Sequence, residues 1–256
     1  MKSDPTAPKR DGDLPRDRNA QKRDLSLTDQ ATRLVRDHIL NLTLEPGVTL
    51  DERQVMERFQ LGRTPMREAM NRLIAEGFVV RKDQRGIQVM PLDIPTAVEL
   101  LDAYVMNERV VASMLRFSDP GVVEELREIQ AMYVRSLSPA NLAKVTEINT
   151  KFHNRLAQAT QNVYIVDQST KLNRLAQRLS YYIFRREATN DLRIPLLFDN
   201  PRKGHDLIIK HIENHDREML VKELTDHATF FRTRLARIIN EDRGKDINFV
   251  GLVLDF

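Results

Sequence analysis

The stretch from Leu50 to Pro91 limits the possible fold more than any other part of the sequence. Its first half predicts two short helices separated at Gly62, because Asp51 can cap the first helix and Thr64 can cap the second. Its second half predicts a β-hairpin, because two short apolar runs flank the basic segment 81–85. Two helices, a tight turn and a hairpin are typical of a winged helix-turn-helix domain, which inserts its second helix into the major groove of DNA.

The second predicted helix carries arginines on the face opposite its apolar stripe. Arg63 and Arg67 are four residues apart near its start, so we expect both to point into the groove, where arginine suits the paired acceptors of guanine. Thr64 and the helix N-terminus are expected to hold a phosphate. The start of the preceding helix and the tip of the hairpin add further expected contacts. The predicted DNA-binding residues are Arg53, Arg63, Thr64, Arg67, Arg85 and Gly86.

This part of the chain resembles the GntR family of bacterial transcription regulators. The resemblance is carried by Arg63-Thr64-Pro65-Met66-Arg67-Glu68-Ala69, by Glu76-Gly77 and by the Arg85-Gly86 tip, and it covers about residues 28–91. It implies a homodimer that binds double-stranded DNA at a palindromic operator. The family usually has Gly-Val-Ser or Gly-Val-Thr where this chain has residues 60–62, so a hydroxyl that would contact a phosphate is missing here.

The length and composition of the chain limit the number of domains and the kinds of site and location that it can have. The chain has 256 residues, enough for two domains, and its lack of cysteine excludes disulfides and cysteine-based zinc sites. No apolar run approaches the roughly 20 residues that a membrane helix needs, and the N-terminus lacks the apolar core of a secretory signal. We therefore expect a cytoplasmic protein that makes no contact with a membrane.

A helical pattern dominates after residue 91. Prolines, glycines and polar pairs divide this part into segments with helical periodicity, at 96–117, 120–137, 139–160, 163–188, 201–215 and 217–240. The expected fold class is mainly α, with an N-terminal winged helix-turn-helix domain and a C-terminal all-α bundle. The expected divisions are a disordered arm (1–26), the DNA-binding domain (27–91), a linker (92–95), the effector- and metal-binding bundle (96–241) and a C-terminal tail (242–256).

Three histidines fall on apolar stripes of three different segments: His153, His205 and His227. An imidazole without a partner is costly to bury, and convergence on one metal ion would satisfy all three. Asn149 lies one helical turn before His153, so the two side chains are expected to project together.

The bundle resembles the FCD ligand-binding domain of the FadR subfamily of GntR regulators. Residues 149–153 match the family's Asp-x-x-Phe-His motif with asparagine in the first position, and the later histidines also match. The resemblance implies a divalent cation at the floor of an effector pocket, with zinc favoured over nickel or manganese. The implied metal ligands are Asn149, His153, His205 and His227. Asparagine lacks the charge of aspartate, so weaker binding of the cation is expected.

The expected effector is a small carboxylate, which an arginine can clamp. The candidate effector-binding residues are Tyr104, which lies near the place of a family arginine, Arg174 and Arg178. We thus expect a ligand-responsive regulator, with repression as the expected sign. A metal-free sensor of the same family is the alternative. A metal-dependent enzyme is the least favoured, because we expect no inward-facing Glu or Asp beside the histidines.

Overall fold

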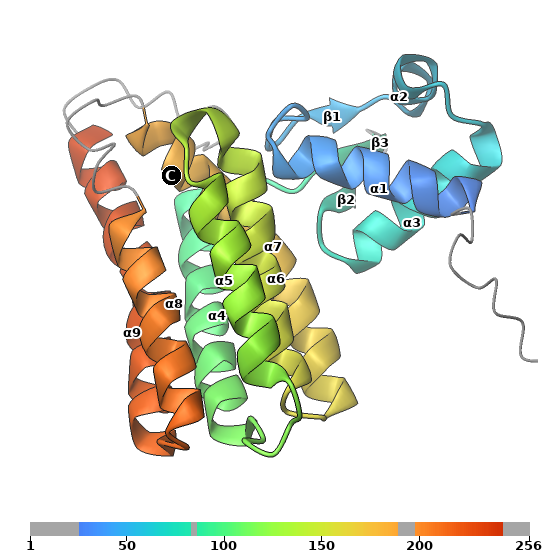
Figure 1. Cartoon of the computed structure of the whole chain (residues 1–256). Coiled ribbons are helices and arrows are strands. Elements are labelled where there is room, and N and C mark those ends of the chain that lie inside the picture. Colours follow the sequence, from blue (N-terminus) through green and yellow to red (C-terminus); the bar gives the residue numbers. More distant parts are fainter. Residues whose placement is uncertain (1–25, 83–85, 189–197, 243–256) are drawn as a thin grey trace, which may run out of the picture.

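The computed structural model describes residues 26–82, 86–188 and 198–242, and it divides into an N-terminal part with a small sheet and a bundle of long helices (Figure 1). The mainly α architecture predicted from the sequence is confirmed. Arg85 lies outside the described residues, as do almost all of the predicted N-terminal arm and of the C-terminal tail.

The N-terminal part contains α1 (Leu27–Leu40), α2 (Glu52–Phe59) and α3 (Arg63–Ala75). Asp51 caps α2 as predicted, because its carboxylate accepts hydrogen bonds from the backbone N–H groups of Arg53 and Gln54. Gln60 then takes a left-handed conformation, which ends α2 and reverses the chain toward α3.

The predicted cap of α3 was wrong. Gly62, and not Thr64, precedes the helix, and its carbonyl accepts the N–H of Met66 at 3.1 Å. Pro65 is tolerated inside the first turn because the N–H groups of that turn have no helical acceptor. Thr64 is therefore an exposed residue of the first turn, and its hydroxyl does not cap the helix.

A three-stranded antiparallel sheet completes the N-terminal part, in the order β1 (Thr49–Leu50), β3 (Gly86–Val89), β2 (Val79–Lys82). The hairpin of β2 and β3 pairs Val79 with Val89 and Lys82 with Gly86. Gly86 has a φ of 80°, a conformation that favours glycine. The sheet and the three helices enclose an apolar core that includes Met66, Met70, Leu73, Phe78 and Ile87.

The bundle consists of α4 (Ile94–Met114), α5 (Val122–Ser136), α6 (Leu142–Gln158), α7 (Val163–Glu187), α8 (Asp199–Glu213) and α9 (Arg217–Asp242), with a short 3-10 helix, η1 (Pro139–Asn141), before α6. Each helix overlaps one of the predicted segments. Helices α8 and α9 lie side by side at the edge farthest from the N-terminal part, and α7 contacts that part through α1 (Figure 1).

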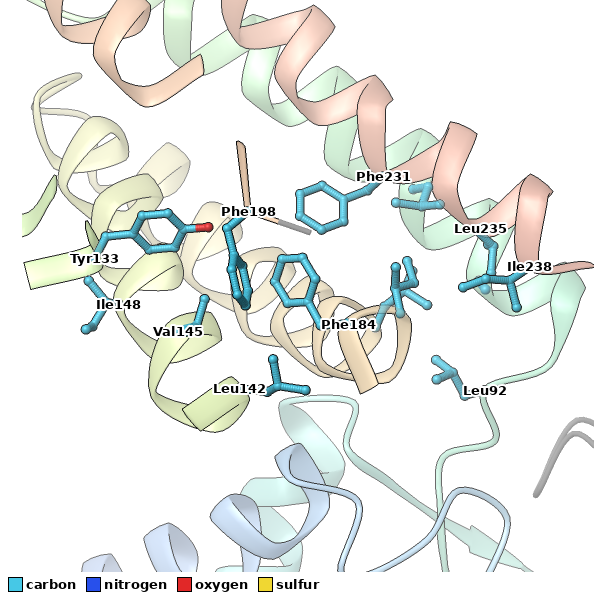
Figure 2. Packing of buried hydrophobic residues seen from close by; sticks show 14 residues of the cluster. Leu92, Tyr133, Leu142, Val145, Ile148, Phe184, Phe198, Phe231, Leu235 and Ile238 are labelled. Atoms are coloured by element: carbon cyan, nitrogen blue, oxygen red, sulfur yellow. The ribbon is translucent and has the colours of Figure 1, made fainter. Parts of the chain in front are cut away.

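Two apolar clusters form the core of the bundle. One contains Phe184, whose ring lies 5.6 Å from that of Phe198 and 5.9 Å from that of Phe231, and it extends to Leu92 next to the N-terminal part (Figure 2). The second cluster is built on Phe152 and its neighbours. Each fully buried phenylalanine contributes roughly 1.5–3 kcal/mol by leaving water. These clusters fix the positions of the helices that carry the histidines.

Candidate metal centre and DNA interface

The three predicted histidines meet inside the bundle. His153 on α6, His205 on α8 and His227 on α9 are all buried, and their ring centroids are 4.9–5.7 Å apart. One ligand atom from each ring lies within 4.8 Å of the other two. His205 stacks on Phe152 at 3.9 Å and also contacts Tyr133, so it lies where the two apolar clusters meet.

A buried carboxylate orients His153. The Nδ1 atom of His153 lies 2.7 Å from Oε2 of Glu108, which α4 contributes and which is fully buried. Because a carboxylate only accepts hydrogen bonds, the proton of the imidazole lies on Nδ1. The Nε2 atom therefore presents a lone pair, as a metal ligand must.

An amide orients His205 in the same way. Gln130 on α5 donates through its Nε2 to the carbonyl of Arg202 at 3.0 Å and to Oδ1 of Asp206 at 2.8 Å. These two bonds fix the side-chain amide, so its oxygen faces Nδ1 of His205 at 2.9 Å. Nδ1 therefore carries the proton, and Nε2 of His205 is left free.

Burial keeps two of the three rings neutral. It lowers the pKa of His227 to about 3, and the neighbouring His153 adds to the effect. Burial also lowers the pKa of His205 well below its ordinary range, with smaller contributions from His227 and His153. Both rings are neutral at neutral pH, which is the form that binds a cation.

Five buried polar atoms on the three histidines, on Glu108 and on Asn149, one helical turn before His153, have no hydrogen-bond partner among the described residues. They are Nε2 of His153, His205 and His227, Oδ1 of Asn149 and Oε1 of Glu108. Each such atom costs about 1–3 kcal/mol if it stays unsatisfied. Three imidazole nitrogens and one amide oxygen form a donor set that suits a divalent transition metal, so the residues present fit the implied cation.

Glu108 and Gln130 were missed from the sequence. The prediction that no inward-facing acidic residue accompanies the histidines was wrong, because Glu108 is buried directly beside His153. A signal was present, since Leu101, Tyr104, Glu108 and Val111 repeat at helical spacing and all four are buried.

The predicted effector-binding residues separate into two groups. Tyr104 is buried beside the centre, with its ring 5.9 Å from that of His153. Burial raises the pKa of Tyr104 well above its ordinary value, and Glu108 adds to this, so its hydroxyl stays protonated. Arg178, by contrast, donates to the backbone carbonyl of Met90 at 2.7 Å, in the segment that joins the bundle to the N-terminal part.

Arg174 also faces the N-terminal part. It lies 3.5 Å from Oε1 of Glu76. The same carboxylate accepts two hydrogen bonds from Arg36 of α1, at 2.8 Å on Oε2 and 2.6 Å on Oε1. The structure therefore places Arg174 and Arg178 at the joint between the two parts of the chain. Helical periodicity showed that these arginines share α7 with apolar residues, but it could not show what that face packs against.

The predicted DNA-contacting side chains lie on the surface of the N-terminal part. Arg63, Thr64 and Arg67 are exposed on α3, and neither arginine forms an ion pair within the described ranges. Arg53 is exposed on α2 and pairs with Glu57 at 3.2 Å. Gly86 is exposed at the start of β3, next to the undescribed residues 83–85. The unpaired guanidinium groups of α3 are thus free to contact an anionic partner.

Comparison with known proteins gives two family matches. Residues 27–89 match the family described as bacterial regulatory proteins, gntR family, and residues 105–230 match the FCD domain. The chain is 24% identical to the gluconate operon transcriptional repressor of Bacillus licheniformis over 200 residues, which cover 77% of this chain and 79% of that protein. It is 23% identical to the HTH-type transcriptional repressor RspR of Escherichia coli K12 over 222 residues, covering 83% and 90%.

A solved structure shares the fold. The crystal structure of a transcriptional regulator GntR from Rhodococcus sp. RHA1 superposes with a TM-score of 0.65 at 18% identity, covering 84% of this chain and 99% of that one. Within the described part of the chain, no helix has the length and apolar character needed to cross a membrane.

Proposed function

Because the chain belongs to the GntR family of bacterial transcription regulators and carries an FCD domain, we propose that it is a repressor whose operator binding responds to a small carboxylate held at a metal centre. Regulation of transcription, and not catalysis, is the function of the relatives it matches. The observation that supports a metal-containing sensor best is the convergence of three buried histidines whose Nε2 atoms have no partner among the described residues.

The residues that would hold the cation are Asn149, His153, His205 and His227. The preferred cation is zinc, with nickel or manganese as alternatives. When bound, it supplies a Lewis acid that can take a carboxylate oxygen. None of the four ligands is a carboxylate, so Glu108 behind His153 is the nearby carboxylate that offsets the charge of the cation. The remaining positive charge favours an anionic effector over a neutral one.

Tyr104 is the residue that we assign to the effector. Its buried ring lies beside His153, and its hydroxyl stays protonated, so it can donate a hydrogen bond to an effector oxygen. A neutral donor in this place recognises a carboxylate less strongly than an arginine does. The centre and Tyr104 together therefore define the effector pocket that we propose.

The path from the pocket to the DNA-binding domain follows α6 and α7. Asn149 and His153 are on α6, and Asn173 of α7 donates to Asn154 of α6 at 2.8 Å. On the same helix, Arg174 follows Asn173 directly and reaches Glu76 in the DNA-binding domain, and Arg178, five residues after Asn173, binds the carbonyl of Met90. A ligand that shifts α6 relative to α7 can change the position of the DNA-binding domain through these contacts. The free energy by which it favours one position equals the difference between its binding free energies for the two positions.

On the DNA side, we propose that a homodimer in the cytoplasm presents two α3 helices to a palindromic operator. Arg63 and Arg67 contact base edges in the major groove, and Thr64 contacts a phosphate. Arg53, Arg85 and Gly86 contact the backbone of the DNA or its minor groove.

A fluorescence-anisotropy titration tests the proposal. The full chain is titrated onto a duplex selected from a random pool, with a panel of small carboxylates, in the presence of Zn²⁺ or of a chelator. We expect at least one carboxylate to weaken binding, and to do so only with Zn²⁺. A carboxylate that acts equally with the chelator would favour a metal-free sensor, the alternative that the neutral Asn149 supports. An affinity that no carboxylate alters would contradict the proposal.

A further inference from the structure

A groove of about 230 Å³ runs between α8 and α9 on the surface of the bundle. Leu207 of α8 and Glu223 and Asp226 of α9 line this groove, together with Gly204 and His227. His227 thus belongs both to the groove and to the histidine centre, and it keeps 5% of its surface exposed, against 1% for His153 and none for His205. It is therefore the histidine of the centre that solvent reaches most easily.

Gly204 allows this contact between the groove and the centre. A Cβ atom at this position would lie only 2.5 Å from Nδ1 of His227, so any other residue would push the ring away. With glycine, the ring of His227 lies against the backbone of α8, with Nδ1 toward Gly204. Its Nε2 is a ligand-capable nitrogen that finds no partner among the described residues.

His227 also lacks the kind of partner that the other two rings have. Glu108 accepts from Nδ1 of His153 and Gln130 from Nδ1 of His205, but no described residue forms a hydrogen bond with His227. A metal-bound imidazole needs an acceptor for its second N–H. For His227 that acceptor must come from the groove, either as solvent or from Glu223, which precedes it by one helical turn.

The groove is lined by two carboxylates, Glu223 and Asp226, and by one ammonium group, that of Lys203, which pairs with Asp199 at 3.6 Å, so its charged side chains favour a cation. Asp226 is paired with Lys222 at 2.7 Å, whereas Glu223 forms no ion pair with any residue that the structure describes. Glu223 therefore offers a carboxylate beside a nearly buried imidazole, and both groups are ligands of divalent metals.

We propose that this groove is the passage through which a divalent cation reaches and leaves the histidine centre. In this arrangement Glu223 attracts the cation, Gly204 lets the ring of His227 lie at the groove, and His227 is the first imidazole that the cation meets. The inference rests on the proposed function in one respect, because it requires that the three histidines bind a cation.

The test compares the rates of Zn²⁺ uptake and removal with the dissociation constant for Zn²⁺. Leu207→Trp places a large ring on the groove and changes no residue of the centre. We expect the rates of Zn²⁺ uptake and of Zn²⁺ removal by a chromophoric chelator, both followed by stopped flow, to fall together by roughly tenfold or more, which corresponds to a barrier about 1.4 kcal/mol higher. The dissociation constant should stay the same, because both rates fall by one factor.

Val134→Trp is the matched control, since Val134 is an exposed apolar residue of α5 that does not line the groove. Its rates should equal those of the unmodified chain. Glu223→Gln provides a second variant with little risk to folding, and we expect slower uptake at low salt with a smaller effect at high salt.

Two different failures can be told apart. If the unmodified chain binds Zn²⁺ but Leu207→Trp and Glu223→Gln both exchange it at the normal rate, the passage lies elsewhere and the inference is wrong. If the unmodified chain binds no Zn²⁺ at equilibrium, the proposed metal centre is wrong and the inference falls with it.

Discussion

Nδ1 of His153 and Oε2 of Glu108 lie 2.7 Å apart, and both side chains are buried. This contact joins α6 to α4 and decides which nitrogen of His153 faces the other histidines. Replacing the carboxylate of Glu108 should therefore act on metal binding through His153, without removing a ligand.

We expect Glu108→Gln to lower the affinity for Zn²⁺ by about 10- to 100-fold, which is the usual effect of losing such a partner of a metal-bound histidine. The measurement is a competition titration against a chelator of known affinity. Glu99→Gln, an exposed change on the same helix, should leave the affinity unchanged. Equal affinities for both variants would show that Glu108 does not orient His153.

For DNA binding, Arg67→Ala should weaken binding to a selected duplex by about 1–3 kcal/mol. The reason is that an exposed guanidinium, which forms no ion pair with a described residue, loses its contacts with base acceptors. The measurement is fluorescence anisotropy at fixed salt. Arg135→Ala, an exposed change on α5 in the bundle, serves as the control. If both variants bind with the same affinity, α3 does not enter the groove in the proposed way.

At the joint, Glu76→Ala should lower the free energy of unfolding by about 1–3 kcal/mol. The change leaves Arg36 and Arg174 without their shared carboxylate. The expected loss is smaller than for a fully buried ion pair, because Arg174 is partly exposed to solvent. Urea denaturation measures the loss. Glu57→Ala breaks an exposed pair with Arg53 and should cost less than about 1 kcal/mol. Similar losses for the two variants would mean that the joint adds no stability.

After metal removal, the protein should lose stability as the pH falls from 7 to 5. The pKa of His227 is about 3 in the folded protein, against an ordinary value of 6.5, so in this range the unfolded chain binds a proton that the folded protein excludes. The contribution of His227 to the free energy of unfolding is therefore greatest above about pH 6.5 and declines toward pH 3. At pH 5, protonation of this residue in the unfolded chain lowers the free energy of unfolding by roughly 2 kcal/mol.

The measurement for this prediction is urea denaturation of the chelator-treated chain at several pH values. A His227→Gln variant removes the titrating group, so its stability should change less with pH over this interval. If the two curves have the same slope, His227 is not held neutral by burial.

Much of this architecture could be predicted from local patterns. Asp51 predicts the start of α2, because a short carboxylate side chain just before a helix accepts hydrogen bonds from its first N–H groups. The apolar stripes of α6, α8 and α9 indicate which faces of these helices are buried. The stripes also placed His153, His205 and His227 on inward faces, and the structure brings these rings together.

What could not be predicted depends on contacts between distant helices. Gln130 has no local signal of its role, because its partners His205 and Asp206 come from a helix some 75 positions later in the chain. From the sequence alone, Gly204 would be expected only to destabilise its helix. Its role is seen in the structure, where the ring of His227 lies against it. Arg174 was predicted to bind the effector, and the structure places it 3.5 Å from Glu76 of the DNA-binding domain, beside a cavity of about 450 Å³ that Arg36 also lines.

The hydrogen bond from Arg178 to residue 90 has a consequence for natural variation. The acceptor is a main-chain carbonyl, which every amino acid supplies, proline included. Position 90 can therefore drift among relatives without losing this attachment, whereas position 178 cannot, because the nearly buried guanidinium has no equivalent in a shorter side chain. A comparison of related sequences would therefore show a constraint at position 178 and none from this contact at position 90.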